Sequence, residues 1–324
     1  MKTKLFVALI WVGVSVFGAG YDRTVWRAMT YGAEFDVLFK VVDDEGAPVA
    51  NAKCSGWMYM ETAPKQGSHY SLYTDTNGFV RVAGKCGEWF SVVLCKEGYY
   101  DTMLDVKYPN RNASPMLVDG KWQPYGETRT VVLKRIRKPR KMLGPDRPPQ
   151  RKIRIYDKWL EFDLERGDFL PPIGNGHDAD MLIRFRLHGR MPDDWSIAMD
   201  VSFTNHPHAG AYRLKKDTWS DMKSSYCADA NAMYQANFTF KYCHEKGVYP
   251  HADKLGKDEY MVFRTRTRVD RDGNLLSARY GKLYGPWHFE DAGGAKIHKV
   301  FMNALDNDVN LEDTWTIEES KKYR

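Results

Sequence analysis

Apolar and polar residues alternate strictly over many short runs of this chain, and this pattern constrains the fold more than any other feature. In the run 181–190, MLIRFRLHGR, apolar residues occupy every second position and charged or polar residues occupy most of the others. The runs 159–165, 234–242 and 260–269 alternate in the same way. A period of two places one side of a strand against a core and the other side in water. Long helical periodicity is missing, so the sequence predicts an all-β protein.

The strand-like runs fall into two groups, which predict two antiparallel β-sandwich domains. The first group lies between residues 34 and 137 and reads EFDVLFKVV, VANAKCSGWMYM, YTDTNGFVRV, EWFSVVLCKEGYY and ETRTVVLKR, with turn residues between the runs. We assign residues 21–137 to the first domain. The second group occupies residues 153–324, and a jelly roll is our candidate arrangement for it.

A basic, proline-rich stretch separates the two groups. Residues 134–152 hold nine Lys or Arg, one Asp and four prolines, whereas the net charge of the whole chain is only +6. Proline interrupts both helices and strand ladders, and like charges repel, so we expect an extended linker over 138–152. A polyanion-binding arm is the alternative. The row formed by Arg264, Arg266 and Arg268 raises the same choice between polyanion binding and pairing with acids of a neighbouring strand.

The N-terminal twenty residues predict export. Residues 1–20, MKTKLFVALIWVGVSVFGAG, combine two lysines, a short apolar run and small residues that suit signal-peptidase cleavage. The apolar run is too short to span a membrane, and no later segment reaches the ~18 apolar residues that a spanning helix needs. We therefore expect a signal peptide and a secreted, periplasmic or extracellular protein without a transmembrane span. Export and the lack of a nucleic-acid-binding motif argue against a nucleic-acid partner.

The first group of strands resembles a known family. The order VVDDEGAPVANAKC, TDTNGFVRV and SVVLCKEGYYD, within residues 34–137, is similar to the carboxypeptidase regulatory-like domain, in which an Asp-Gly turn, a Thr-Asp-x-x-Gly-Phe hairpin and a Lys-x-Gly-Tyr strand end follow one another. The resemblance implies a prealbumin-like, immunoglobulin-like sandwich over about a third of the chain. The sequence departs from the family pattern in its three cysteines and in the insertion 107–126. Residues 153–324 resemble no family that we recognise.

The segment 73–82, YTDTNGFVRV, offers a choice between a calcium loop and a tight turn. Asp75, Asn77 and Gly78 have the spacing that opens a calcium loop, and similar patterns recur at 42–49 and 269–276. A helix–loop–helix calcium site needs a bidentate Glu at position twelve, but Cys86 stands there. The segment lies between two strand-like runs, so it predicts a hairpin turn in which Gly78 takes a positive φ.

Enzyme motifs are missing from the sequence. No His-Glu-x-x-His, no His followed by Glu three residues later, no Gly-x-Ser-x-Gly elbow and no phosphate loop occur. The acids are too many for a glycosidase pair to be singled out by sequence. The sequence therefore names no catalytic residue and favours a non-enzymatic role.

Two groups of polar residues are candidate metal ligands, whereas no other cofactor is expected. Alternate acids and amides form an oxygen-rich calcium candidate: Asp306, Asp308, Asn310 and Glu312. A second candidate requires two loops to meet: His177, Asp178, Asp180, His206 and His208. In both cases the alternative is a solvated polar turn.

Cysteine and aromatic residues supply the remaining candidates. We expect a disulfide between Cys227 and Cys243, because export offers an oxidising compartment and these are the two cysteines of the second domain. The pairing of the three cysteines in the first domain stays open. Aromatic side chains of the first domain could stack on sugar rings or pack in its core: Trp57, Tyr59, Tyr70, Tyr73, Trp122 and Tyr125.

These expectations favour one function over two alternatives. The leading hypothesis is an exported, non-enzymatic protein that binds or displays a glycan or a surface protein. The alternatives are an extracellular hydrolase that acts on polysaccharide through acids we cannot identify, and a structural module of a surface assembly.

Overall fold

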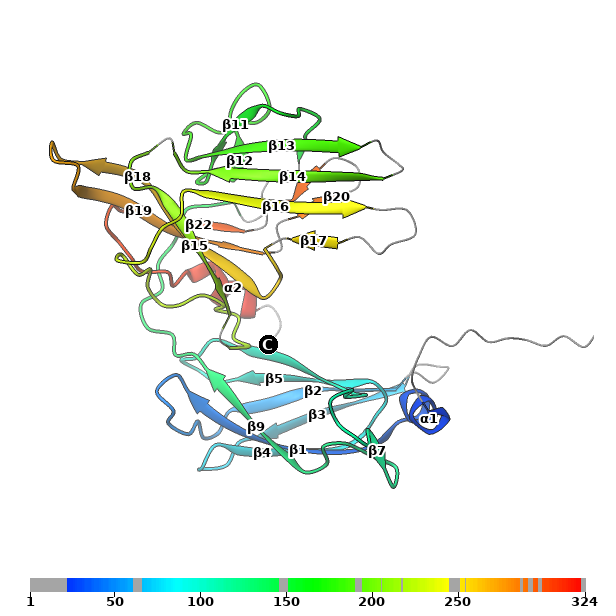
Figure 1. The fold of residues 1–324 in the computed structure, drawn as a ribbon. Helices are drawn as coiled ribbons and strands as arrows, with labels where there is room; N and C mark the ends of the chain where they lie inside the picture. Colours follow the sequence, from blue (N-terminus) through cyan, green and yellow to red (C-terminus); the bar gives the residue numbers. More distant parts are fainter. Residues whose placement is uncertain are drawn as a thin grey trace, which may run out of the picture.

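We describe the protein from a computed structural model, which covers residues 22–60, 66–145, 151–189, 194–204, 206–216, 218–244, 251–253, 255–285, 288–290, 294–296 and 299–321. The expected signal peptide lies outside these residues. Strands dominate the described part of the chain, and only two short helices accompany them. The all-β fold predicted from the alternation is confirmed, and the strands form two β-sandwiches (Figure 1).

The first sandwich contains one helix and nine strands: α1 (Arg23–Tyr31), β1 (Ala33–Asp43), β2 (Lys53–Met60), β3 (Gln66–Tyr73), β4 (Phe79–Cys86), β5 (Trp89–Cys95), β6 (Thr102–Lys107), β7 (Leu117–Val118), β8 (Lys121–Trp122) and β9 (Glu127–Leu133). Sheet A has the order β4-β1-β8-β7, and β9 also pairs with β1. Sheet B has the order β3-β2-β5-β6. The helix α1 begins after Asp22, whose side chain accepts a hydrogen bond from the Thr24 amide.

Sheet A differs from the expected purely antiparallel arrangement. The strand β9 runs parallel to β1, in a register that extends from Val37 opposite Glu127 to Asp43 opposite Leu133. A parallel neighbour requires a long connection, because the chain must return to the starting end of the sheet before the new strand begins. The inserted residues between β6 and β9 supply part of that connection.

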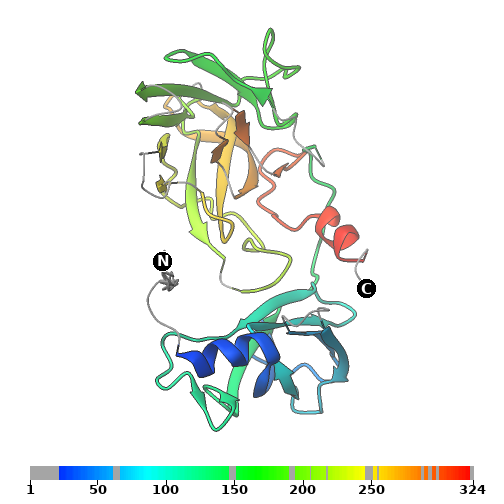
Figure 2. The ribbon, with the colours of Figure 1, turned by 90° about the vertical axis from the view of Figure 1, so that its right-hand side faces the viewer.

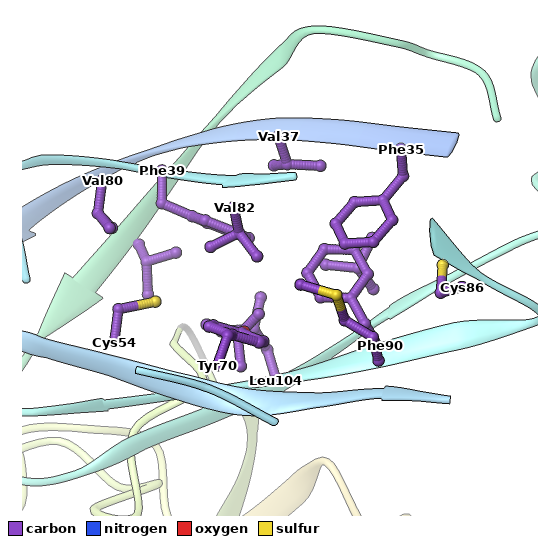
Figure 3. Close-up of a cluster of buried hydrophobic side chains, with 14 of the residues drawn as sticks. Phe35, Val37, Phe39, Cys54, Tyr70, Val80, Val82, Cys86, Phe90 and Leu104 are labelled. Atoms are coloured by element: carbon purple, nitrogen blue, oxygen red, sulfur yellow. The ribbon is translucent and has the colours of Figure 1, made fainter. Parts of the chain in front are cut away.

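A single hydrophobic core fills the space between sheets A and B (Figure 3). Phe35, Val37 and Phe39 of β1 point inward at every second position, as the alternation predicted. The ring of Phe35 stacks on Phe90 from the opposite sheet, with ring centroids 4.2 Å apart. Burial of these aromatic and aliphatic side chains drives the two sheets together.

Three tight turns in the chain share one hydrogen-bonding geometry, which shows the role of Asp75. Its Oδ1 atom accepts hydrogen bonds from the amides of Asn77, over 2.9 Å, and Phe79, over 2.8 Å. The carboxylates of Asp43 and Asp270 accept from the amides two and four residues later in the same way. Gly78 has a φ of +78°. The tight turn predicted from the sequence is therefore confirmed, but it connects β3 of sheet B to β4 of sheet A, so the expected hairpin is wrong.

The second sandwich follows in the chain with these strands and a final helix: β10 (Arg151–Lys152), β11 (Trp159–Asp163), β12 (Asp168–Phe169), β13 (Met181–Gly189), β14 (Trp195–Ser202), β15 (Gly210–Lys215), β16 (Asn237–His244), β17 (His251–Asp253), β18 (Glu259–Val269), β19 (Leu275–Tyr284), β20 (His288–Glu290), β21 (Gly294–Lys296), β22 (Val300–Met302) and α2 (Thr314–Lys321). Sheet C has the order β12-β11-β13-β14-β16-β17, and sheet D has the order β15-β18-β19-β22. A small third sheet has the order β10-β21-β20.

Sheets C and D enclose the second large core, and all their described pairings are antiparallel. Phe185, Met199 and Phe263 are buried between the sheets. Some neighbouring strands are consecutive in the sequence, such as β13-β14 and β18-β19, whereas others are not, such as β14-β16 and β15-β18. The chain thus combines hairpins within a sheet with crossings between sheets C and D, as at β14-β15 and β15-β16, and the jelly-roll arrangement stays a prediction.

The basic stretch between the sandwiches is not simply solvated. The amides of Arg137 and Lys138 donate to the Glu312 carboxylate, over 2.8 and 2.6 Å. Further along, Leu143 exchanges both backbone hydrogen bonds with Met302 of β22. We had expected an extended linker over 138–152. Its first part instead lies against the second sandwich, because a buried carboxylate and an open strand edge satisfy its backbone.

The two sandwiches also touch directly. A loop of the second sandwich reaches the edge of sheet B (Figure 2), where Thr102 of β6 pairs with Ser220. The Lys134 ammonium is buried and donates to the Ser224 carbonyl over 3.0 Å. The Tyr100 hydroxyl donates to Glu312 over 3.2 Å. These contacts join the sandwiches through polar groups that water no longer reaches.

Candidate functional site

The outer face of sheet B carries an unusual concentration of aromatic side chains. On β2, β5 and β6 the even-numbered residues point into the core, and the register sets the odd-numbered residues of β3 beside those of β2, so the odd-numbered residues share the outer face. Trp57 and Tyr73 are 54% and 59% exposed. We call this surface the aromatic face and define it by five side chains: Trp57, Tyr59, His69, Tyr73 and Trp89.

The ring of Trp57 is held in place but left open to solvent. Its backbone amide donates to Ser91 Oγ over 2.9 Å, which fixes β2 against β5 at this point. The His69 ring, directly across on β3, meets the indole edge-on with centroids 5.9 Å apart. At Gly67 a Cβ atom would stand 3.0 Å from Trp57 Cε3. The glycine therefore leaves room for the indole where a side chain would crowd it.

A second aromatic pair extends the face along the same strands. The rings of Tyr59 and Trp89 stack with centroids 5.4 Å apart and an interplanar angle of 16°. Short polar residues and charged residues alternate with the rings on the same side of the sheet: Ser55, Ser71, Ser91, Asp105 and Lys107. Flat apolar rings beside hydrogen-bonding groups can hold a ligand that has both apolar faces and many hydroxyl groups.

Two of the six predicted stacking residues belong to the core instead. Tyr70 is 9% exposed and Trp122 is fully buried. The Tyr70 hydroxyl donates to the Ser91 carbonyl over 2.7 Å, and Trp122 Nε1 donates to the Cys86 carbonyl over 2.9 Å. Each ring fills the core while its polar atom finds a backbone partner, so these two assignments were wrong.

The other predicted residues divide between two surfaces. Trp57, Tyr59 and Tyr73 lie on the aromatic face, whereas Tyr125 lies in the segment between β8 and β9 with the Lys121 ammonium 4.8 Å from its ring centroid. His69 and Trp89 were missed. Their odd positions, the same parity as Trp57, would have placed them on the outer face once the strands were aligned.

The candidate metal cluster that includes Asp178 and Asp180 is organised around an arginine. Asp180 is fully buried, and its carboxylate accepts from Arg266 Nε over 2.8 Å. Glu165 and Asp178 contact the same guanidinium, over 2.8 and 3.2 Å. Burial raises the pKa of Asp180, while the hydrogen bond and the charge of Arg266 oppose that shift. These acids thus converge on a cation that the chain itself supplies.

The histidines of that cluster do not join the acids. His206 Nε2 contacts the Ala179 carbonyl and His208 Nε2 contacts the Gly273 carbonyl, over 3.2 and 2.8 Å. The amide of His177 donates to Asp163. Among the described residues, no group of three or more His, Cys, Asp or Glu side chains is arranged to hold a metal ion.

The four side chains of the calcium candidate at 306–312 each bind a different group of the protein. Asp306 pairs with Arg268 and Asp308 with Arg140, each over 2.8 Å. Glu312 receives the backbone amides of the basic stretch described above. The Asn310 side chain donates to the Lys138 carbonyl over 2.7 Å. The four side chains therefore fix loops and the basic stretch and do not converge on one point.

The predicted disulfide is wrong, because Cys227 and Cys243 are both free. Cys227 lies in a loop that forms an isolated bridge with Asn310. Cys243 lies on β16, where it pairs with Ser196 and His251 in sheet C. Backbone pairing thus assigns each cysteine to a different partner. Cys54 and Cys86 of the first sandwich are buried free thiols, and burial raises the pKa of each to about 12.

Comparison with known proteins gives no identity for this chain. No family model and no curated protein matches the sequence. Three solved structures show weak similarity. The 3-chlorocatechol 1,2-dioxygenase of Rhodococcus opacus is 15% identical with a TM-score of 0.27, and the match covers 33% of this chain and 62% of the dioxygenase.

The other two structures match over greater lengths but at lower scores. A proposed carbohydrate-binding protein of Bacteroides uniformis is 7% identical over 86% of this chain and 100% of its own, with a TM-score of 0.19. The major pilin subunit BcpA of Bacillus cereus is 13% identical over 84% of this chain and 96% of its own, with a TM-score of 0.20. At these TM-scores none of the three supports an argument about function. Within the described residues, no helix is long and apolar enough to cross a membrane.

Proposed function

We propose that this chain is an exported, non-enzymatic glycan-binding protein that holds a polysaccharide on the aromatic face of sheet B. The N-terminal sequence pattern supports export, and the exposure of Trp57 carries the proposal for binding. Exposure of an indole ring to water is unfavourable in free energy. A contiguous patch of exposed apolar or aromatic side chains therefore often marks a binding site.

The shape of the site suits a sugar chain. Sheet B offers ring faces along neighbouring strands, at Trp57 and Tyr59 on β2 and at Tyr73 on β3. Pyranose rings present apolar C–H faces that pack against aromatic rings, and their hydroxyl groups need hydrogen-bonding partners at the edges. Ser55, Ser71 and the exposed Asp105 supply such partners between the rings.

The surroundings of the rings favour a glycan over a protein partner. The core of a protein–protein interface is depleted of charged residues. On the aromatic face, Lys53, Asp105 and Lys107 are exposed on the same side of the sheet as the rings. Ser71 lies between His69 and Tyr73 on β3, and Ser55 lies beside Ser71 on β2, so the surface between Trp57 and Tyr73 is polar.

The test is a binding survey with the mature full-length chain. A glycan array with neutral and charged oligosaccharides would identify a ligand, and calorimetry would give its affinity. We expect Trp57→Ala and Tyr73→Ala each to weaken binding about tenfold, the effect of losing about 1.4 kcal/mol of stacking energy.

The control replaces an exposed tryptophan elsewhere. Trp26 on α1 is 52% exposed and lies outside the aromatic face, so Trp26→Ala should leave the affinity unchanged. The proposal fails if the array shows no glycan binding, or if Trp26→Ala and Trp57→Ala weaken binding equally.

A further inference from the structure

The outer face of sheet C holds a row of four side chains that the aromatic face does not involve. Cross-strand pairing places Trp159 of β11 beside Arg184 of β13, Arg184 beside Asp200 of β14, and Asp200 beside Thr239 of β16. All four point away from the core, because their neighbours Leu160, Ile183, Val201 and Phe240 are buried on the other side of the sheet.

Two arginines share the single carboxylate of Asp200. Arg186 binds it through Nε and Nη2, over 2.7 and 2.9 Å, and Arg184 binds Oδ2 through the same two nitrogens, over 3.1 and 3.0 Å. Thr239 Oγ1 donates to Oδ1 over 2.9 Å. The Asp200 side chain is only 9% exposed, so it is a fixed anchor for both guanidinium groups.

The arrangement leaves hydrogen-bonding capacity unused. Arg184 and Arg186 both donate to Asp200 through Nε and Nη2. Within the described residues, the Nη1 group of neither arginine has a hydrogen-bond partner. Both arginine side chains are 34% exposed. Lys241 is exposed on the same face, where the strand register pairs it with Asp253 of β17, and Glu161 is exposed on β11.

Trp159 adds an apolar surface at the end of the row. The Arg184 guanidinium lies 4.5 Å from the indole centroid and covers one side of the ring, yet 43% of Trp159 remains exposed. We call these side chains the cationic face: Trp159, Arg184, Arg186, Thr239 and Lys241, anchored by Asp200.

We propose that the cationic face is a second binding site, which takes an acidic polysaccharide through the carboxylate of a uronic acid unit. Planar guanidinium groups match carboxylates, and Arg186 already shows a two-point contact of this kind with Asp200. The exposed indole of Trp159 would pack against the ring of a neighbouring sugar. The site lies on the second sandwich and does not depend on the aromatic face.

The probe is polygalacturonate, compared with the same polymer after its carboxyl groups have been reduced to alcohols. We expect the mature full-length chain to bind polygalacturonate at low salt, to bind it progressively less as sodium chloride rises, and to bind the reduced polymer at least tenfold more weakly. Trp159→Ala and Arg186→Gln should each reduce the affinity for polygalacturonate at least tenfold.

Two controls keep the result interpretable. Trp219 lies on the same sandwich and is 50% exposed, and the Lys216 ammonium is 4.5 Å from its ring centroid. Trp219→Ala therefore removes a similar exposed indole beside a cation, but outside the cationic face. It should bind polygalacturonate like the unaltered protein. Trp26→Ala, on α1 of the first sandwich and outside both faces, should do the same.

Thermal unfolding of each variant would show whether it folds, and Trp159→Ala removes no partner of a buried charge. The proposal is overturned if polygalacturonate does not bind, if the reduced polymer binds equally well, or if the folded Trp159→Ala and Arg186→Gln variants retain full affinity. An equal loss of affinity for polygalacturonate in Trp219→Ala would also overturn the proposal.

Discussion

The ammonium group of Lys282 donates a hydrogen bond to the Asp313 carboxylate over 2.7 Å, and both side chains are almost completely buried. Lys282 lies on β19, and Asp313 directly precedes α2. The carboxylate also accepts from the Thr316 amide over 2.6 Å, so one buried group fixes the sheet and the start of the helix together.

Breaking this pair should destabilise the second sandwich strongly. In Lys282→Met, Asp313 would lose its counter-ion while remaining buried, which costs about 3–5 kcal/mol in comparable buried pairs. Urea unfolding followed by tryptophan fluorescence would measure the change. The double variant Lys282→Met/Asp313→Asn, which removes both charges, should be less destabilised than Lys282→Met alone. Equal stability of the single variant and the unaltered protein would contradict the assigned role.

The stability of the second sandwich should depend on Asp200 in acid. The hydrogen bond from Arg186 lowers the pKa of Asp200 to about 2, below the ~3.9 of an unfolded aspartate. The folded state thus favours the ionised form, and this stabilisation of about 2 kcal/mol is complete above the unfolded pKa. It is lost as the pH falls from about 4 to about 2.

Urea unfolding of the unaltered protein and of Asp200→Asn at several pH values would test this dependence. The gap in unfolding free energy between the two proteins should narrow between pH 5 and pH 2. A gap that stays constant over this range would show that the Asp200 carboxylate is not held in its ionised form by the arginines.

Gly78→Ala should cost more stability than the same change at another turn glycine. Both Gly78 and Gly46 have positive φ, +78° and +85°. A Cβ at Gly78 would stand 2.4 Å from the Val41 carbonyl oxygen, whereas at Gly46 nothing lies within 4 Å. We expect about 1 kcal/mol for Gly46→Ala from backbone strain alone and about 3 kcal/mol for Gly78→Ala. Similar losses in thermal unfolding would refute the steric explanation.

Glu312→Ala should weaken the link between the sandwiches. The change leaves the part-buried amides of Arg137 and Lys138 without their acceptor, and the loss of each hydrogen bond costs about 1 kcal/mol. We expect a lower free energy of unfolding and a loss of cooperativity between the two sandwiches in calorimetry. Tyr100→Phe, which removes one long hydrogen bond to the same carboxylate, should have a smaller effect. A single sharp transition at the original midpoint in Glu312→Ala would contradict the prediction.

Calcium should leave the melting temperature unchanged. Asp75 already accepts two backbone amides, and Asp306 and Asp308 are paired with arginines. A calcium ion would have to displace these partners, and it would gain few further oxygen ligands. Melting curves with millimolar calcium and with chelator should therefore superimpose. A calcium-dependent rise that Asp308→Asn abolishes would show that the 306–312 segment is a site after all.

The sequence predicted local features well, because they depend on neighbours in the chain. The alternation in 181–190 placed Met181, Ile183 and Phe185 in the core, and the structure agrees. The turn at Asp75 was also correct, since its hydrogen bonds span only a few residues. Features of this kind follow from strand periodicity and from side-chain bonds to the adjacent backbone.

Features that depend on distant segments were missed. The row of Arg264, Arg266 and Arg268 reads as one strand face, but a β-bulge between Thr265 and Arg268 interrupts it, and Arg266 has a φ of +49°. The bulge allows the Arg266 side chain to reach the acids around Asp180. Nothing local to the sequence marks this bulge, and nothing local marks which aromatic residues of the first sandwich face outward.

The parallel pairing of β1 with β9 has a mechanical consequence. The chain enters the first sandwich near Ala33 at one end of β1 and leaves after Leu133, which lies beside Asp43 at the other end. A pulling force applied between the N-terminal side and the second sandwich would therefore act along these strands. Their hydrogen bonds would be loaded in shear and would have to fail together, whereas an antiparallel pair pulled from one end would peel apart one bond at a time. The first sandwich is thus built to resist tension along its long axis.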